Sequence, residues 1–138
     1  MNYKGIKDKI HVCQNCKGNI PFKTYGNGNL HKFCNSKCSG EFRSKKSKER
    51  FERGEIKNRG MIYNYICERD GNKCSVCRIN KWNGTTIRFW VDHIDGNAAN
   101  NMPNNFRLIC PNCDSQSPTF GNHNKGKGRR SLGLKPYE

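Results

Sequence analysis

The residues of this chain that can bind a metal or move a proton are paired cysteines, one acid–histidine pair and one further acid. Eight of the nine cysteines form close pairs: Cys13/Cys16, Cys34/Cys38, Cys74/Cys77 and Cys110/Cys113. Thiolates at this spacing are typical zinc ligands. Asp92 and His93 are adjacent, and Asp114 follows the histidine by 21 positions. Carboxylates hold hard divalent cations, and an imidazole near its ordinary pKa can act as a general base.

The order of the cysteine pairs predicts two zinc sites with four thiolate ligands each. The first site would use Cys13, Cys16, Cys34 and Cys38, and the second Cys74, Cys77, Cys110 and Cys113. The alternative, a set of free core thiols, does not explain the spacing. Residues 1–10 are basic and contain no apolar segment, so we expect no export signal, a cytoplasmic location and therefore few disulfides. The ninth cysteine, Cys67, lies beside an apolar helix face and is expected to be a buried thiol.

Short strands and helices must position the two acids and the histidine. A β-branched and aromatic run over residues 85–91 predicts a strand that ends at Asp92 and His93. A polar loop rich in Gly and Asn follows, and the apolar residues of 106–109 predict a second strand. A helix is expected next, with Asp114 at its start and residues 115–120 forming the third element. The order strand, loop, strand and helix would bring the two acids and the histidine together.

Over residues 63–124 the chain resembles the HNH, or ββα-metal, nucleases. The resemblance implies a centre with one catalytic divalent cation, magnesium or manganese. It makes Asp92 the first metal ligand, His93 the general base and Asn105 the residue that braces the loop. Asp114 stands where that family has histidine or asparagine as its second metal ligand, which is a departure from the pattern. The implied activity is metal-dependent hydrolysis of DNA phosphodiester bonds.

The N-terminal part carries the first predicted zinc site and a basic helix. A tight knuckle at residues 13–16 is followed by a predicted hairpin, with strands over 22–25 and 30–33, and by a helix that begins near Cys34 and runs to about Arg53. The order knuckle, hairpin and helix resembles a treble-clef zinc finger. A second helix is expected over residues 61–69, where Ile62 and Ile66 stand at helical spacing.

Charge indicates the kind of partner. The chain has 26 Lys and Arg against 11 Asp and Glu, a formal net charge of +15. Binding of two zinc ions by eight thiolates lowers this charge but leaves it positive. Nucleic acid is the expected partner, because neutralised phosphates release counterions. No segment with a broad apolar face supports binding to a membrane. The candidate DNA-binding residues are Lys45, Lys46, Lys48, Arg50, Arg107, Lys125, Lys127, Arg129 and Arg130.

Some of these residues have a second interpretation. The basic helix could be a charged spacer, and Arg107 could be a solvated strand arginine. Trp82 and Trp90 could stack on bases, but aromatic residues beside a strand are expected in the core. His123 follows the predicted helix and is expected to be exposed.

The sequence therefore predicts a small α+β protein in three parts. A treble-clef-like zinc finger with a basic helix occupies residues 1–56, a zinc-stapled ββα-metal nuclease module 57–124, and a flexible basic tail 125–138. The predicted function is that of a metal-dependent endonuclease acting on DNA. The alternative is a non-catalytic zinc protein that binds nucleic acid. A monomer and a homodimer both remain open, as do nicking or double-strand cleavage and a homing, restriction or phage DNA-processing role.

Overall fold

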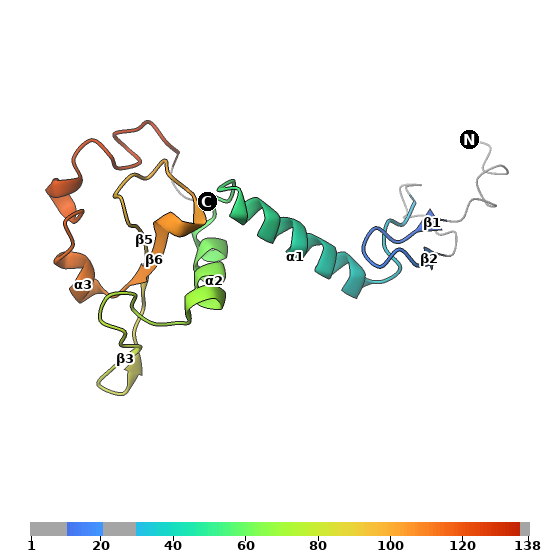
Figure 1. Ribbon diagram of the computed structural model, residues 1–138, viewed down its shortest axis with the longest axis horizontal. Helices are drawn as coiled ribbons and strands as arrows, with labels where there is room; N and C mark the ends of the chain where they lie inside the picture. Colours follow the sequence, from blue (N-terminus) through green and yellow to red (C-terminus); the bar gives the residue numbers. More distant parts are fainter. Residues whose placement is uncertain (1–10, 21–29, 136–138) are drawn as a thin grey trace. The chain divides into compact units, whose positions relative to one another are not determined.

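The computed structural model describes residues 11–20 and 30–135 (Figure 1). It shows a small α+β protein with short two-stranded sheets and three α-helices in the described residues, as the sequence predicts. The chain divides into two compact units, Met1–Ser47 and Lys48–Glu138, and each is described by itself. Among the described residues, no helix has the length and the apolar character needed to cross a membrane.

The first unit is built around a cysteine knuckle. Strands β1 (His11–Val12) and β2 (Asn19–Ile20) pair antiparallel on either side of it. The amide of Cys13 donates to the Gly18 carbonyl at 2.8 Å, and the amide of Lys17 donates back to the Cys13 carbonyl at 3.0 Å. Lys17 has a φ of 62°, a left-handed conformation that closes the knuckle. Most of the hairpin predicted over residues 22–33 lies outside the described residues.

Helix α1 (Ser36–Glu52) is the predicted basic helix. The side chain of Asn35 accepts a hydrogen bond from the Cys38 amide at 2.8 Å and so satisfies one of the unpaired donors of the first turn. The helix ends at Glu52, and the chain turns at Gly54, whose φ is 70° and whose amide donates to the Phe51 carbonyl at 2.8 Å. A left-handed glycine at this position is a common way to close a helix.

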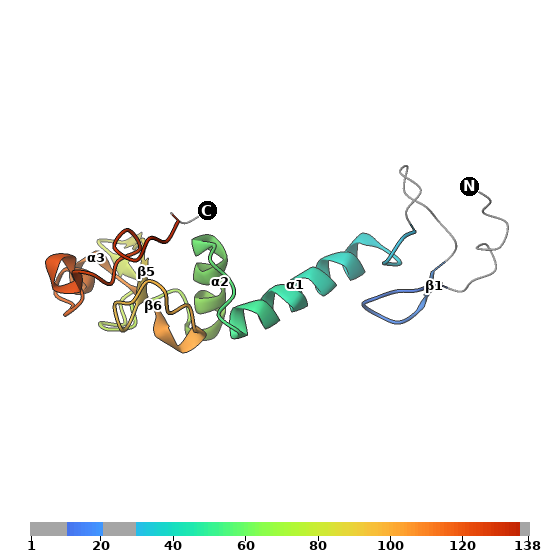
Figure 2. The ribbon, with the colours of Figure 1, turned by 90° about the horizontal axis from the view of Figure 1, so that it is seen from above.

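The core of the second unit lies between helix α2 and a two-stranded sheet. Helix α2 (Arg59–Asp70) covers the range predicted for the second helix and extends it by two residues at the N-terminus and one at the C-terminus. Its Ile62 and Ile66 are fully buried and pack against Leu108 and its neighbours. Strands β5 (Trp90–His93) and β6 (Phe106–Ile109) form the sheet. Helix α2 lies beside these strands in both ribbon views (Figures 1 and 2).

The strand predicted over residues 85–91 is in fact divided between two sheets. Strands β3 (Lys81–Trp82) and β4 (Thr85–Thr86) form a separate hairpin, closed by Asn83 and Gly84 with φ values of 46° and 76°. An Asn-Gly turn with two positive φ values is the preferred two-residue hairpin turn, so Thr85 and Thr86 pair backward rather than continuing into β5. Trp82 and Trp90 are 68% and 50% exposed, so the expectation that both lie in the core was wrong.

Helix α3 (Pro111–Ser115) begins earlier than predicted, and residues 115–120 do not form the expected element. Cys110 is its N-cap, Pro111 its first residue, and the Cys110 sulfur accepts from the Cys113 amide at 3.5 Å. Cys113 lies in this helix and Cys110 is its N-cap, so the helix and its cap supply two of the four cysteines of the second predicted zinc site. Proline is well placed at this first position because its missing N–H has no helical partner there.

The tail folds back on the loop between β5 and β6. The Asn124 side chain donates to the Gly96 carbonyl at 2.7 Å, and the Ala98 amide donates to the Lys127 carbonyl at 3.1 Å. Gly96 has a φ of 70°, and a Cβ there would lie 2.5 Å from the Asn124 side-chain oxygen. Residues 121–124 form the short 3-10 helix η3 (Gly121–Asn124), and most of residues 125–135 adopt turns. The flexibility predicted for residues 125–138 stays a prediction.

Candidate active site

The eight paired cysteines form two groups, as predicted. In each group the four sulfur atoms lie within 4.8 Å of one another. The Sγ atoms of Cys16 and Cys34 are 3.8 Å apart, and so are the Sγ atoms of Cys77 and Cys110. Four sulfurs at zinc–sulfur distances of about 2.3 Å in a tetrahedron would be about 3.8 Å apart. Both groups are therefore compatible with zinc in donor type, number and spacing.

The two Cys-x-x-Cys knuckles share one backbone pattern. The Cys74 amide donates to the Ile79 carbonyl and the Arg78 amide donates to the Cys74 carbonyl, both at 3.0 Å, as in the knuckle at Cys13. Arg78 is left-handed with a φ of 66°, as Lys17 is in the first knuckle. Cys67 belongs to neither group: its side chain is half-buried and its sulfur lies 3.8 Å from the Asn72 side-chain oxygen.

Asp92 and Arg107 form a cross-strand ion pair on the face of the sheet. They are directly opposite in the register of β5 and β6, and the Arg107 Nε lies 2.7 Å from the Asp92 Oδ2. The two side chains are only 16% and 21% exposed. Arg107 was expected to bind a phosphate or to be solvated; in the structure its guanidinium is bound to the candidate metal ligand.

Asp114 belongs to the same charged cluster. Burial raises the pKa of Asp114, and the negative charge of Asp92 raises it further, while Arg107 opposes the rise. The structure thus brings the two acids within electrostatic reach and places one arginine near both. Two carboxylates and a single cation leave the cluster with an excess negative charge. Hard oxygen donors with an excess negative charge suit a divalent cation such as magnesium.

His93 is the last residue of β5 and lies on the opposite side of the strand from Asp92. It pairs in register with Phe106, and the two rings are 4.7 Å apart at an angle of 50°. His93 is 7% exposed, and its Nε2 lies 3.5 Å from the Asn101 Oδ1. Burial lowers the pKa of His93, which favours the neutral imidazole that a general base requires.

Asn105 lies in the centre of a hydrogen-bond network that holds the loop between the strands. Its Nδ2 donates to the Asp95 Oδ1 and to the Asn100 carbonyl, both at 2.9 Å. Its Oδ1 accepts from the Asp95 amide at 3.1 Å. Asp95 also accepts from the Asn97 amide and from the Asn100 side chain. Burial alone would raise the pKa of Asp95, but these hydrogen bonds outweigh it and lower that pKa.

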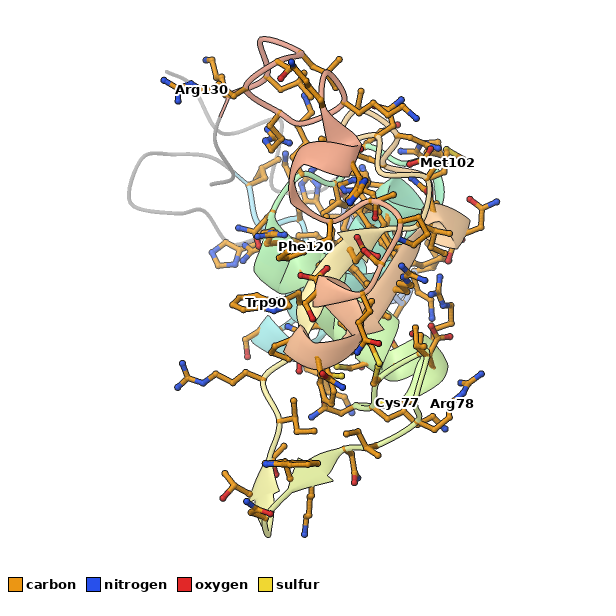
Figure 3. All side chains as sticks on the ribbon, turned by 90° about the vertical axis from the view of Figure 1, so that its left-hand side faces the viewer. Cys77, Arg78, Trp90, Met102, Phe120 and Arg130 are labelled. Carbon is orange, nitrogen blue, oxygen red and sulfur yellow. The ribbon has the colours of Figure 1, made fainter. Side chains whose placement is uncertain are left out.

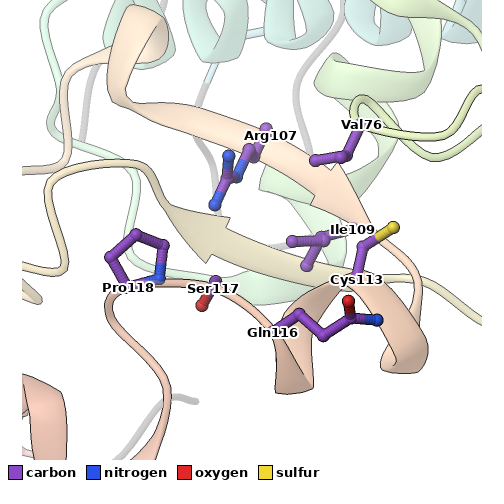
Figure 4. Close-up of a pocket in the computed structure, with 7 residues that line it drawn as sticks. All are labelled: Val76, Arg107, Ile109, Cys113, Gln116, Ser117 and Pro118. Atoms are coloured by element: carbon purple, nitrogen blue, oxygen red, sulfur yellow. The ribbon is translucent and has the colours of Figure 1, made fainter.

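A cavity of about 250 Å³ opens beside the charged cluster (Figure 4). Arg107 and Ile109 of β6 line it together with Val76, Cys113 of α3, and the residues that directly follow α3, which are Gln116, Ser117 and Pro118. Because Arg107 both lines this cavity and holds Asp92, it connects the cavity with the candidate metal ligands. A phosphate group entering the cavity would meet the guanidinium directly.

Except for Arg107 and Arg129, the predicted DNA-binding cations are exposed, and several of them contact other side chains. Lys48 is 3.7 Å from Glu68, Arg50 is 3.5 Å from Glu55, and Lys46 lies over the Phe42 ring. Lys45, Lys125, Lys127 and Arg130 are exposed, and Arg129 is half-buried. His123 is exposed, as expected.

Sequence reasoning missed two residues that position the site. Arg69 of α2 donates to the carbonyls of Pro103 at 2.6 Å and Phe106 at 2.9 Å, and so fixes the start of β6. The Oδ1 of Asn101 lies 3.5 Å from the Nε2 of His93. The Arg69 contacts join residues 34 and 37 positions apart, whereas Asn101 is eight positions from His93. Neither residue stands in a motif that could have revealed it.

Together the fold and these groups define a small α+β protein with two four-cysteine sites and a carboxylate cluster between two strands and a short helix. The chain is similar to the H-N-H endonuclease F-TflIV of Escherichia phage T5, with 38% identity over 56 residues. The matched region covers 41% of this chain and 25% of that protein, so the chain spans about a quarter of its relative's length. No family model and no solved structure matches the chain.

Proposed function

We propose that this protein is a metal-dependent endonuclease that hydrolyses DNA phosphodiester bonds. The observation that carries the proposal is the cluster of Asp92, Arg107 and Asp114 beside a cavity, with His93 at the end of the same strand as Asp92. The name of the phage T5 relative supports the same activity. The basic composition supports DNA as the substrate.

Asp92 and Asp114 would hold one magnesium or manganese ion. When bound, such an ion stabilises negative charge on the phosphate and on the leaving oxygen. His93 takes one proton from a water molecule, whose oxygen forms a bond to phosphorus as the bond from phosphorus to the 3′ oxygen breaks. Asn105 keeps the loop fixed and thereby holds His93 in place. Arg107 binds a non-bridging phosphate oxygen in the cavity that it lines.

The two cysteine groups have a structural role in this proposal. Four thiolates fill the coordination shell of zinc and leave no position for substrate. The second group joins the knuckle at Cys74 to the start of α3 at Cys110. Zinc bound there would hold α3, which carries Asp114, against the sheet whose strand β5 carries Asp92.

One experiment tests the proposal directly. Zinc-loaded protein is incubated with supercoiled plasmid, with magnesium or with magnesium omitted, beside His93→Ala. We expect relaxed or linear plasmid only with the unaltered protein and magnesium. Omitting magnesium is a better control than adding a chelator, because a chelator would also attack the cysteine sites. Full activity in His93→Ala would refute the role of the base.

A second candidate function is favoured by a specific observation. His93 is 7% exposed and Asp92 is engaged by Arg107, which is also what a non-catalytic protein that binds nucleic acid would show. In that case the plasmid would be bound but left intact under every metal condition. A gel-shift assay run beside the cleavage assay separates the two functions.

A further inference from the structure

The hairpin of β3 and β4 borders a second hollow that plays no part in the proposed chemistry. The hairpin stands away from the other strands of its unit (Figures 1 and 3). Between it and the start of α3 lies a hollow of about 410 Å³. Its lining is mostly apolar and consists of Ile79, Trp82, Ile87, Cys110, Pro111 and Asn112.

Trp82 is an unusual residue for such a place. It is 68% exposed and is not part of the hydrophobic core that surrounds Ile62 and Leu108. Its neighbour Ile79 is 38% exposed. Contiguous apolar side chains that remain exposed around a hollow are a mark of a ligand-binding groove. The Asn83-Gly84 turn holds the hairpin in a fixed form, so Trp82 is presented by a defined backbone.

The charges of the chain segment that carries Trp82 indicate what the hollow binds. From Gly71 to Val91 the chain contains four cations, Lys73, Arg78, Lys81 and Arg88, and no acid. All four are exposed. The occupant therefore has to combine a flat apolar group with a negatively charged backbone. An unpaired nucleobase with its flanking phosphates meets both conditions, because bases stack on aromatic side chains and phosphates bind nearby cations.

We propose that this hollow binds an unpaired nucleobase of DNA, which stacks on Trp82 while its phosphates contact the exposed cations of the same chain segment. The bases of an intact duplex stack on one another and do not present their faces. The inference rests on the proposed function in taking DNA as the partner. It adds the class of substrate, which is single-stranded DNA or duplex DNA that is locally unpaired.

The chain offers a direct reporter, because it contains two tryptophans. Trp90→Phe leaves Trp82 as the single tryptophan, and Trp82→Phe leaves Trp90 as the matched control. Both zinc-loaded variants are titrated with a short oligothymidylate and with a duplex of the same length, without added magnesium so that no cleavage occurs. We expect strong quenching of Trp82 fluorescence by the single strand, little by the duplex, and a weaker response of Trp90.

The energetic test uses Trp82→Ala, which should weaken binding of oligothymidylate about tenfold, as expected for the loss of one stacked base. Trp90→Ala is the control for loss of an exposed indole, and zinc content shows that each variant folds. Unchanged fluorescence of Trp82 together with unchanged affinity of Trp82→Ala would overturn the proposal. Equal quenching by duplex would also overturn it, because the hollow would then bind paired DNA.

The outcome is independent of the cleavage assay. Quenching of Trp82 by oligothymidylate in a protein that, with magnesium, cleaves neither plasmid nor single-stranded DNA would establish the base site and refute the proposed endonuclease. Plasmid cleavage without any response of Trp82 would support the endonuclease and refute the base site.

Discussion

Asp92 and Arg107 face one another across β5 and β6, and the Nε of the arginine lies 2.7 Å from a carboxylate oxygen of the aspartate. The pair fixes a candidate metal ligand before any metal binds. It also places a cation where a divalent ion and a phosphate would have to approach. We therefore expect Arg107 to influence both the stability of the fold and the affinity of the proposed site for metal.

Replacing Arg107 with Gln should lower the stability of the metal-free site. The side chains are only partly exposed, so loss of the partner leaves Asp92 charged in a poor environment. We expect a loss of about 1–3 kcal/mol, between the values typical of exposed and of buried pairs. Urea unfolding of the zinc-loaded protein measures it. Arg88→Gln, which removes an exposed arginine, is the matched control and should change stability much less.

Asp114 should set the metal preference. Two carboxylates form a hard site that favours magnesium and manganese, whereas an imidazole favours zinc and nickel. We expect cleavage with magnesium or manganese and poor activity with zinc or nickel. Asp114→His should shift activity toward nickel or zinc, and Asp114→Ala should lose most of it. An unaltered protein inactive with all four metals, yet active as Asp114→His, would show that the native site is non-functional.

Cleavage should persist to lower pH than an ordinary histidine allows. Burial lowers the pKa of His93, so the neutral imidazole survives below the usual value of about 6.5. The lowered pKa of His93 also makes the free energy of unfolding depend on pH. The folded state binds fewer protons than the unfolded state, so stability falls as the pH drops through the unfolded pKa. The acid limb of kcat/KM against pH measures this. A midpoint at or above 6.5 would contradict it.

Removing the first unit should weaken DNA binding. Residues 1–47 carry 10 Lys and Arg against 2 acids, whereas residues 48–138 carry 16 against 9. Deleting residues 1–47 should lower DNA affinity and make it less dependent on salt, since fewer phosphates are neutralised. The deletion stops before Phe51 and Ile56, both buried in the second unit. An unchanged salt slope would mean that this unit does not contact DNA.

Native mass spectrometry should find two zinc ions in each chain. Cys77→Ala should retain one, because it removes a ligand of the second group, and the second unit should lose stability. Cys67→Ala is the control: it removes the ninth cysteine, which lies outside both groups, and should retain both ions. Loss of zinc from Cys67→Ala would show that the assignment of ligands is wrong.

The features that could be predicted from the sequence are those with a local cause. Zinc ligands recur at fixed spacing, and β6 and α2 follow from short apolar patterns. The position of α3 was also locally encoded, since Cys110 and Pro111 are good N-cap and first-turn residues, but that signal was overlooked. The Asn83-Gly84 turn that separates β4 from β5 was likewise visible in the sequence.

The remaining features depend on contacts between distant residues. The pairing of Arg107 with Asp92 requires the exact register of two strands separated by a loop of 12 residues, 94–105. A slip of one residue would have turned Arg107 to the other face. The contact of Asn101 with His93 depends on how that loop folds back. Sequence pattern alone carries no information about either.

Gly96 and the tail also have an evolutionary consequence. A side chain at Gly96 would collide with Asn124 and would lie 2.8 Å from the Thr119 methyl carbon, so the turn and the tail constrain each other's mutations. In related chains, the residue at this turn and the length of the C-terminal extension should therefore vary together. A lineage that lost the extension would lose the contact with Asn124 but keep the one with Thr119, so the constraint at the turn would be relaxed and not removed.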